Sequence, residues 1–158
     1  MNLVVSAPTW VLVILAVLVL AAAVEDAVRL RISNATCAGV LVLAIITMFI
    51  EGPSLLLWQN GVVFLALLIV GTAVFAAGQM GGGDVKLLAA LGAWVSLKGG
   101  VWLVTTVFMA GGLLAVGFIL ARLMRGTGIK RSAKGGVPYG VAIAAGAAIT
   151  FAAQRGAF

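Results

Sequence analysis

The chain has 158 residues, of which 64% are apolar and 9% are charged, and its formal net charge is +6. Its mean hydropathy of +1.28 excludes a soluble globular domain, because the surface of such a domain needs far more polar residues. With one cysteine and no histidine, the side chains predict neither a disulfide framework nor a zinc site, and we expect no metal or other cofactor. We therefore predict a single membrane-embedded domain over residues 1–158.

Six apolar runs predict an all-α polytopic membrane protein of about six transmembrane helices, since roughly 17 to 25 apolar residues cross a bilayer as a helix. The runs cover residues 8–24, 35–50, 55–77, 85–97, 101–121 and 137–153. No Lys or Arg precedes the first run, which ends in the charged segment from Glu25 to Arg31. We therefore expect a retained helix and not a cleaved signal peptide.

The fourth run is short and follows a glycine-rich stretch. Residues 85–97 would rise only about 20 Å as a helix, whereas the hydrocarbon core is about 30 Å thick. Three glycines and Asp84 come directly before it, and we expect Lys98-Gly99-Gly100 to interrupt the helical structure after it. This shortness predicts a half-sunken or locally thinned site.

The basic residues predict the orientation of the helices, because the side richer in Lys and Arg stays in the cytoplasm. With six spans, both termini fall on one side, and the connections that carry most of the basic residues fall on the other. The basic side holds Arg29, Arg31, Lys86, Arg122, Arg125, Lys130, Arg131 and Lys134, and the other side holds Lys98 and Arg155. We expect both termini outside and attribute the positive charge to topology and anionic lipid, with no nucleic-acid partner.

Two aspartates are the candidate catalytic residues. Asp26 closes the first predicted helix and Asp84 opens the fourth, so both are expected at the cytoplasmic interface. Desolvation and mutual repulsion would keep one of two adjacent carboxyls protonated, which is the state that an aspartic protease uses. Each acid also has a purely structural explanation: Asp26 could pair with Arg29 at helical spacing, and Asp84 could cap a helix.

Three segments resemble the type IV prepilin peptidase family of membrane-embedded aspartic proteases. Gly81-Gly82-Gly83-Asp84 matches the Gly-x-Gly-Asp motif of that family, and residues 85–92 after it are also similar. Residues 26–34 resemble the segment with the other catalytic aspartate, although Ser33 replaces the usual proline. Residues 137–144, which contain Pro138-Tyr139-Gly140, resemble the start of the family's last helix.

The resemblance implies that Asp26 and Asp84 are catalytic, that Gly81 and Gly83 position the backbone, and that no metal takes part. The substrate would be a prepilin or pilin-like precursor whose short basic leader is removed at the cytoplasmic face of a bacterial inner membrane. Larger members of the family carry an additional domain with paired Cys-x-x-Cys motifs and also methylate the pilin. This chain has one cysteine and resembles the short, peptidase-only form of tight-adherence (Flp) pili.

Two other functions stay open at this stage. The chain could be a small transporter or channel subunit in which Asp84 binds a cation or a proton, or a non-catalytic membrane component of a pilus or secretion assembly. Acids deep within spans or an inverted repeat would favour transport, and we find neither. Loss of one motif acid would favour a scaffold, yet both acids are present. The sequence predicts neither the pilin that is cleaved nor the oligomeric state.

Overall fold

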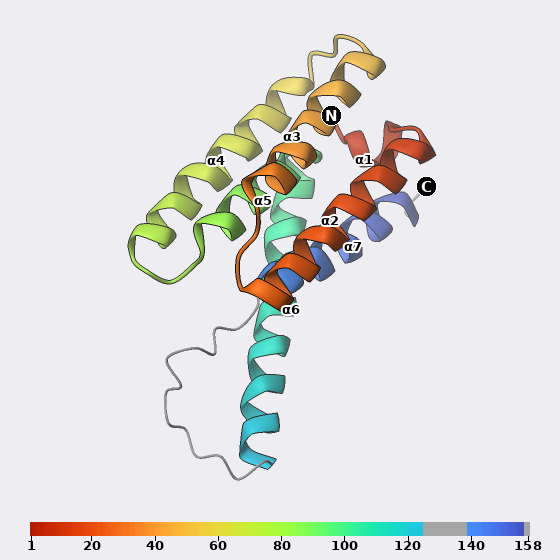
Figure 1. Cartoon of the computed structure of the whole chain (residues 1–158). Coiled ribbons are helices and arrows are strands. Elements are labelled where there is room, and N and C mark those ends of the chain that lie inside the picture. Colours follow the sequence, from red (N-terminus) through yellow and green to blue (C-terminus); the bar gives the residue numbers. More distant parts are fainter. Residues whose placement is uncertain (125–138, 157–158) are drawn as a thin grey trace.

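The computed structural model describes residues 1–124 and 139–156, and this part of the chain is all-α, without a strand (Figure 1). The all-α prediction is confirmed. Six helices follow the six apolar runs in order, and one additional short helix precedes them. The helices are α1 (Leu3–Ser6), α2 (Thr9–Arg29), α3 (Asn34–Glu51), α4 (Leu57–Ala76), α5 (Gly82–Gly92), α6 (Leu97–Met124) and α7 (Tyr139–Gly156).

Four of these helices, α2, α3, α4 and α6, are long and apolar enough to cross a membrane, as a polytopic membrane protein requires. Helix α5 has 11 residues and rises about 16 Å, so it is too short to cross the hydrocarbon core. Helix α7 has 18 residues but is rich in Ala and Gly, which are less apolar than the Leu, Ile and Val of the other helices. Of the six predicted spans, α5 is therefore shorter and α7 less apolar than the four long ones.

Helix α5 lies at the centre of the molecule. It packs against α3, α4 and α7, and every residue from Asp84 to Val95 is buried except Lys86. A helix that is buried on all sides has to be apolar on all sides, which explains the continuous apolar run. The fully buried Trp94 fixes its far end, because the indole Nε1 donates to the carbonyl of Val40 at 3.2 Å. This packing gives the first turn of α5, which carries Asp84, a fixed position.

The predicted break at Lys98-Gly99-Gly100 is wrong. Helix α5 ends at Gly92 and α6 already begins at Leu97, because Ser96 provides the helix start: its Oγ accepts the N–H of Gly99 at 3.4 Å. The glycines serve close packing. A Cβ on Gly100 would lie 2.8 Å from Cγ1 of Val63, so this glycine lets α6 approach α4.

The two ends of the helical bundle are different. Both termini lie at one end, where the side chain of Asn2 donates to that of Gln154 at 2.7 Å (Figure 1). Asp26, in the last turn of α2, and Asp84, in the first turn of α5, lie at the other end. Four of the basic residues predicted for that end, Arg125, Lys130, Arg131 and Lys134, lie outside the described residues, as does Pro138 of the Pro-Tyr-Gly segment.

Candidate active site

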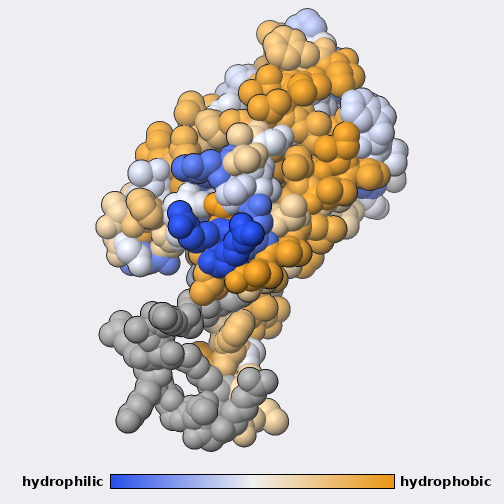
Figure 2. Space-filling model, viewed as in Figure 1, coloured by the Kyte–Doolittle hydropathy of each residue, from blue (hydrophilic) through white to orange (hydrophobic). Residues whose placement is uncertain are grey.

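Asp26 and Asp84 line the same cavity, which has a volume of about 580 Å³. Its walls come from the end of α2, the connection to α3, and the start of α5. Figure 2 shows strongly hydrophilic side chains gathered over this region on a largely apolar face. The other lining residues are Glu25, Arg29, Leu30, Arg31, Ile32, Ser33, Asn34, Phe75, Gly81, Gly82, Gly83 and Lys86.

The carboxyl of Asp26 is held by the start of the last helix. Asp26 is 4% exposed, and its Oδ2 accepts the backbone N–H of Gly140 at 2.6 Å. The proposed pairing with Arg29 is not what the structure shows: Arg29 is exposed and lines the cavity, and within the described residues no ion pair joins it to Asp26. A short hydrogen bond from a backbone N–H stabilises the ionised form of a carboxyl.

The carboxyl of Asp84 has a longer hydrogen bond than that of Asp26. Asp84 is 8% exposed, and its Oδ2 accepts the N–H of Gly81 at 3.2 Å, so the helix-cap explanation accounts for one of its oxygens. Its Oδ1 is buried and has no hydrogen-bond partner among the described residues. Burial, followed by the nearby charge of Asp26, raises the pKa of Asp84 from 3.8 to about 6. An unsatisfied buried oxygen costs stability, and groups with strongly shifted pKa values concentrate at functional sites.

Ile32 packs against the start of α5, which carries Asp84, and against the start of α7, which binds Asp26. It is 8% exposed. A Cβ on Gly83 would lie 3.0 Å from the carbonyl oxygen of Ile32, and a Cβ on Gly140 would lie 2.9 Å from its Cδ1. Gly83 is therefore needed because the backbone of α5 approaches that of Ile32 closely. A positive φ is not the reason, since neither Gly81 nor Gly83 has one.

Three residues contribute to this site without a signal in the sequence that would predict it. They are Gly140, which the sequence marks only as part of a family segment, Ile32, and Glu25, which the sequence marks only as one charge of the segment after the first apolar run. The motif spacing contains no signal for these contacts, because each joins residues that are brought together by the packing of separate helices. Lys86, in contrast, makes a contact across the cavity rim, where its Nζ donates to Oδ1 of Asn34 at 2.8 Å.

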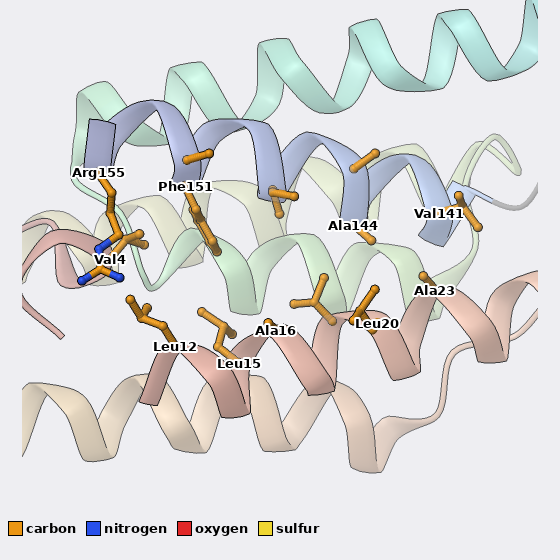
Figure 3. Close-up of a pocket in the computed structure, with 15 residues that line it drawn as sticks. Val4, Leu12, Leu15, Ala16, Leu20, Ala23, Val141, Ala144, Phe151 and Arg155 are labelled. Carbon is orange, nitrogen blue, oxygen red and sulfur yellow. The ribbon is translucent and has the colours of Figure 1, made fainter. Parts of the chain in front are cut away.

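A second cavity, of about 610 Å³, lies between α2 and α7 (Figure 3). Its lining side chains are apolar except for Arg155, at the end near the termini. Among the described residues, its lining includes no acid or nucleophile that could carry out hydrolysis, despite its larger volume. Within the described residues, no group of three or more His, Cys, Asp or Glu side chains could hold a metal ion. The polar cavity with its two aspartates is therefore the candidate active site.

Comparison with known proteins agrees with this assignment at the level of the family. Neither the search of curated proteins nor the search of solved structures gave a match. Residues 13–120 match the type IV leader peptidase family, and this range includes Asp26, Ile32, the three glycines and Asp84. The match covers more than half of the chain, and the chain therefore belongs to the type IV leader peptidase family.

Proposed function

We propose that this protein is an aspartic endopeptidase of a bacterial inner membrane that removes the short basic leader from a prepilin or pilin-like precursor. One observation carries the proposal: Asp26 and Asp84 are the only buried acidic side chains among the described residues, and both line one polar cavity. Membership of the leader peptidase family favours proteolysis over the transport and scaffold functions that the sequence left open.

The different surroundings of the two carboxyls support different roles in hydrolysis. The Gly140 N–H donates to Oδ2 of Asp26 at 2.6 Å, a contact that offsets part of the effect of burying this carboxyl. Burial and the nearby charge of Asp26 favour the protonated form of Asp84. Ionised Asp26 takes a proton from a water molecule as its oxygen attacks the scissile carbonyl carbon. Protonated Asp84 donates its proton to the carbonyl oxygen. When the C–N bond breaks, a proton passes to the leaving amine, and the products are a new carboxyl and a new amino terminus.

The position of the cavity suits a substrate that leaves the membrane at this point. It lies at one end of the helices, and Arg29, Arg31 and Lys86 line it. By the positive-inside rule, we assign this end to the cytoplasm and the end with both termini to the opposite side. A leader on the cytoplasmic side would then reach the acids while the apolar helix that follows it stays within the bilayer.

The chemistry proposed here is proteolysis alone. The chain has a single cysteine, Cys37, which is buried with its Sγ 3.6 Å from the carbonyl of Gly83. It therefore lacks the paired cysteine motifs of the larger, methylating members of the family. We infer a single peptidase domain over residues 1–158, of the short form that serves tight-adherence (Flp) pili.

The test is cleavage of a candidate prepilin by the protein purified in detergent, followed by the shift of the substrate on a gel. Asp26→Asn and Asp84→Asn should each abolish cleavage, because Asn keeps the size of the side chain but cannot exchange a proton. Glu51→Gln, an acid at the other end of α3, is the matched control and should cleave normally. Cleavage at the wild-type rate by either Asn variant would rule out the two-aspartate mechanism and return the transport and scaffold functions to consideration.

A further inference from the structure

Glu25, which the hydrolysis mechanism does not use, anchors the connection between α2 and α3. Its Oε2 accepts the backbone N–H of Ser33 at 2.8 Å. The hydroxyl of Thr36 also donates to this carboxylate, at 3.2 Å to Oε1 and 3.1 Å to Oε2. Ser33 in turn caps α3, because its Oγ accepts the N–H of Thr36 at 3.1 Å. One carboxylate in the last turn of α2 thus holds the start of α3.

The residue next to this anchor contacts a neighbour of each acid. Ile32 directly precedes Ser33, its backbone lies against Gly83 beside Asp84, and its side chain lies against Gly140, which binds Asp26. A displacement of the connection would therefore move Ile32 and both neighbouring segments.

The connection needs an anchor because its residues do not by themselves favour the backbone conformation that they adopt. Leu30 is in the left-handed conformation, with φ of 51°, and is the only non-glycine residue with a positive φ among those described; such a conformation is unfavourable for a leucine. Ser33 has φ of −71° and ψ of 146°, a conformation that a proline ring would fix and a serine does not. Unlike proline, serine has the N–H that Glu25 accepts.

We propose that Glu25 is a positioning residue of this peptidase, whose carboxylate fixes the Ser33 backbone and so keeps Ile32 packed against Gly83, beside Asp84, and against Gly140, which binds Asp26. In this chain the Glu25–Ser33 hydrogen bond restricts the backbone at position 33, as a proline there would. The inference rests on the proposed function for its catalytic consequence, while the structural consequence can be measured without a substrate.

A double-mutant cycle tests the proposal. Glu25→Ala should lower kcat for prepilin cleavage roughly tenfold, with little change in KM, because a charge-assisted hydrogen bond to the positioning segment is lost. Ser33→Pro fits the observed φ and removes the N–H, so in that background Glu25→Ala should cost no more than roughly threefold. Ser33→Ala is the matched control: it loses the hydroxyl but keeps the N–H, and Glu25→Ala should remain as harmful in it as in the wild type.

Alkylation of Cys37 gives a readout that needs no substrate, since this thiol lies in the first turn of α3 against Gly83. Glu25→Ala should make the thiol react severalfold faster with N-ethylmaleimide in detergent, and Ser33→Pro should reverse that increase. Unchanged alkylation and cleavage in Glu25→Ala would overturn the proposal. If wild-type protein cleaved no prepilin, the proposed function would fail, and the alkylation rates would still decide whether Glu25 holds the segment.

The variant Glu25→Gln distinguishes positioning from direct chemistry. Its amide oxygen can still accept the Ser33 N–H, so we expect its kcat to lie between those of the wild type and Glu25→Ala. A loss as complete as that of Asp26→Asn, unrelieved by Ser33→Pro, would place Glu25 in the proton transfer itself and overturn the positioning role.

Discussion

The backbone N–H of Gly140 donates a 2.6 Å hydrogen bond to Oδ2 of Asp26, joining two residues that are 114 positions apart in the chain. Through this contact the first turn of α7 positions an acid at the end of α2. It gives the Pro-Tyr-Gly segment a physical role: a glycine at position 140 lets the backbone come close enough to donate its N–H. Gly140 lies outside the residues matched to the family, whereas Asp26 lies within them.

Gly140→Ala should inactivate the protein without unfolding it. The added Cβ would lie 2.8 Å from Cβ and 2.9 Å from Oδ2 of Asp26, so the carboxyl has to move. A displacement of about 1 Å in a catalytic group lowers the rate roughly a hundredfold. The measurement is the cleavage rate per folded protein in detergent. Gly112→Ala, at a helical position with nothing within 4 Å, is the control and should retain full activity; equal rates for both variants would remove the positional role of Gly140.

The three glycines before Asp84 should respond differently to alanine. At Gly82 the new Cβ would be in ordinary contact with the Phe75 ring, 3.4 Å away, so this variant should cleave almost normally. At Gly81 it would lie 2.7 Å from Oδ2 of Asp84, a flexible end. That variant should therefore lose activity while keeping its melting temperature.

Gly83→Ala should lose both activity and stability, because its Cβ would meet the backbone oxygen of Ile32 at 3.0 Å. The rates and melting temperatures of the three variants provide the measurement. If all three cleaved equally well, Asp84 would be no more than a helix cap.

The raised pKa of Asp84 predicts how cleavage depends on pH. In the proposed mechanism Asp84 donates a proton, so the rate should fall as the pH rises through the apparent pKa of the acid pair. We expect this pKa near the value of about 6 for Asp84, or above it once the substrate expels water. The measurement is the single-turnover rate against pH. A rate that rises with pH through this range would exchange the roles of the two aspartates.

The raised pKa of Asp84 also predicts that the stability of the folded protein falls as the pH rises. The folded protein binds this proton more tightly than the unfolded chain does, so the contribution of Asp84 to stability is complete below pH 3.8 and is lost as the pH rises through about 6. As the pH rises over that range, the melting temperature of the wild type should therefore fall relative to that of Asp84→Asn. A difference that stays constant with pH would show that the acid is not perturbed.

Cysteine labelling tests the proposed orientation. In a Cys37→Ser background, a cysteine at Leu55, which is 95% exposed near the terminal end of the bundle, should react with a membrane-impermeant maleimide in intact cells. A cysteine at Arg31, which lines the acid cavity, should react only after permeabilisation. The reverse pattern would place the acids outside the cytoplasm and remove the explanation of where the leader is cut.

The parts of the structure that the sequence predicted are those that local pattern determines. Apolar runs predicted the six main helices because a helix in lipid has to be apolar along its length, and residues 85–97 correctly indicated one helix too short to span. The break after that helix was misplaced because Ser96 could start α6 and the glycines could pack inside it. Proximity of Asp26 and Asp84 was inferred from motifs, whereas the contacts that hold them depend on tertiary packing.

Because the Gly140 N–H is the partner of Asp26, the acid pair is complete only after the last helix has taken its place beside the first. During synthesis, both aspartates are in the membrane well before α7 has been made. A nascent chain at that stage holds the two acids but lacks the donor that fixes one of them. The hydrolysis that we propose would therefore begin only at the end of the protein's own insertion.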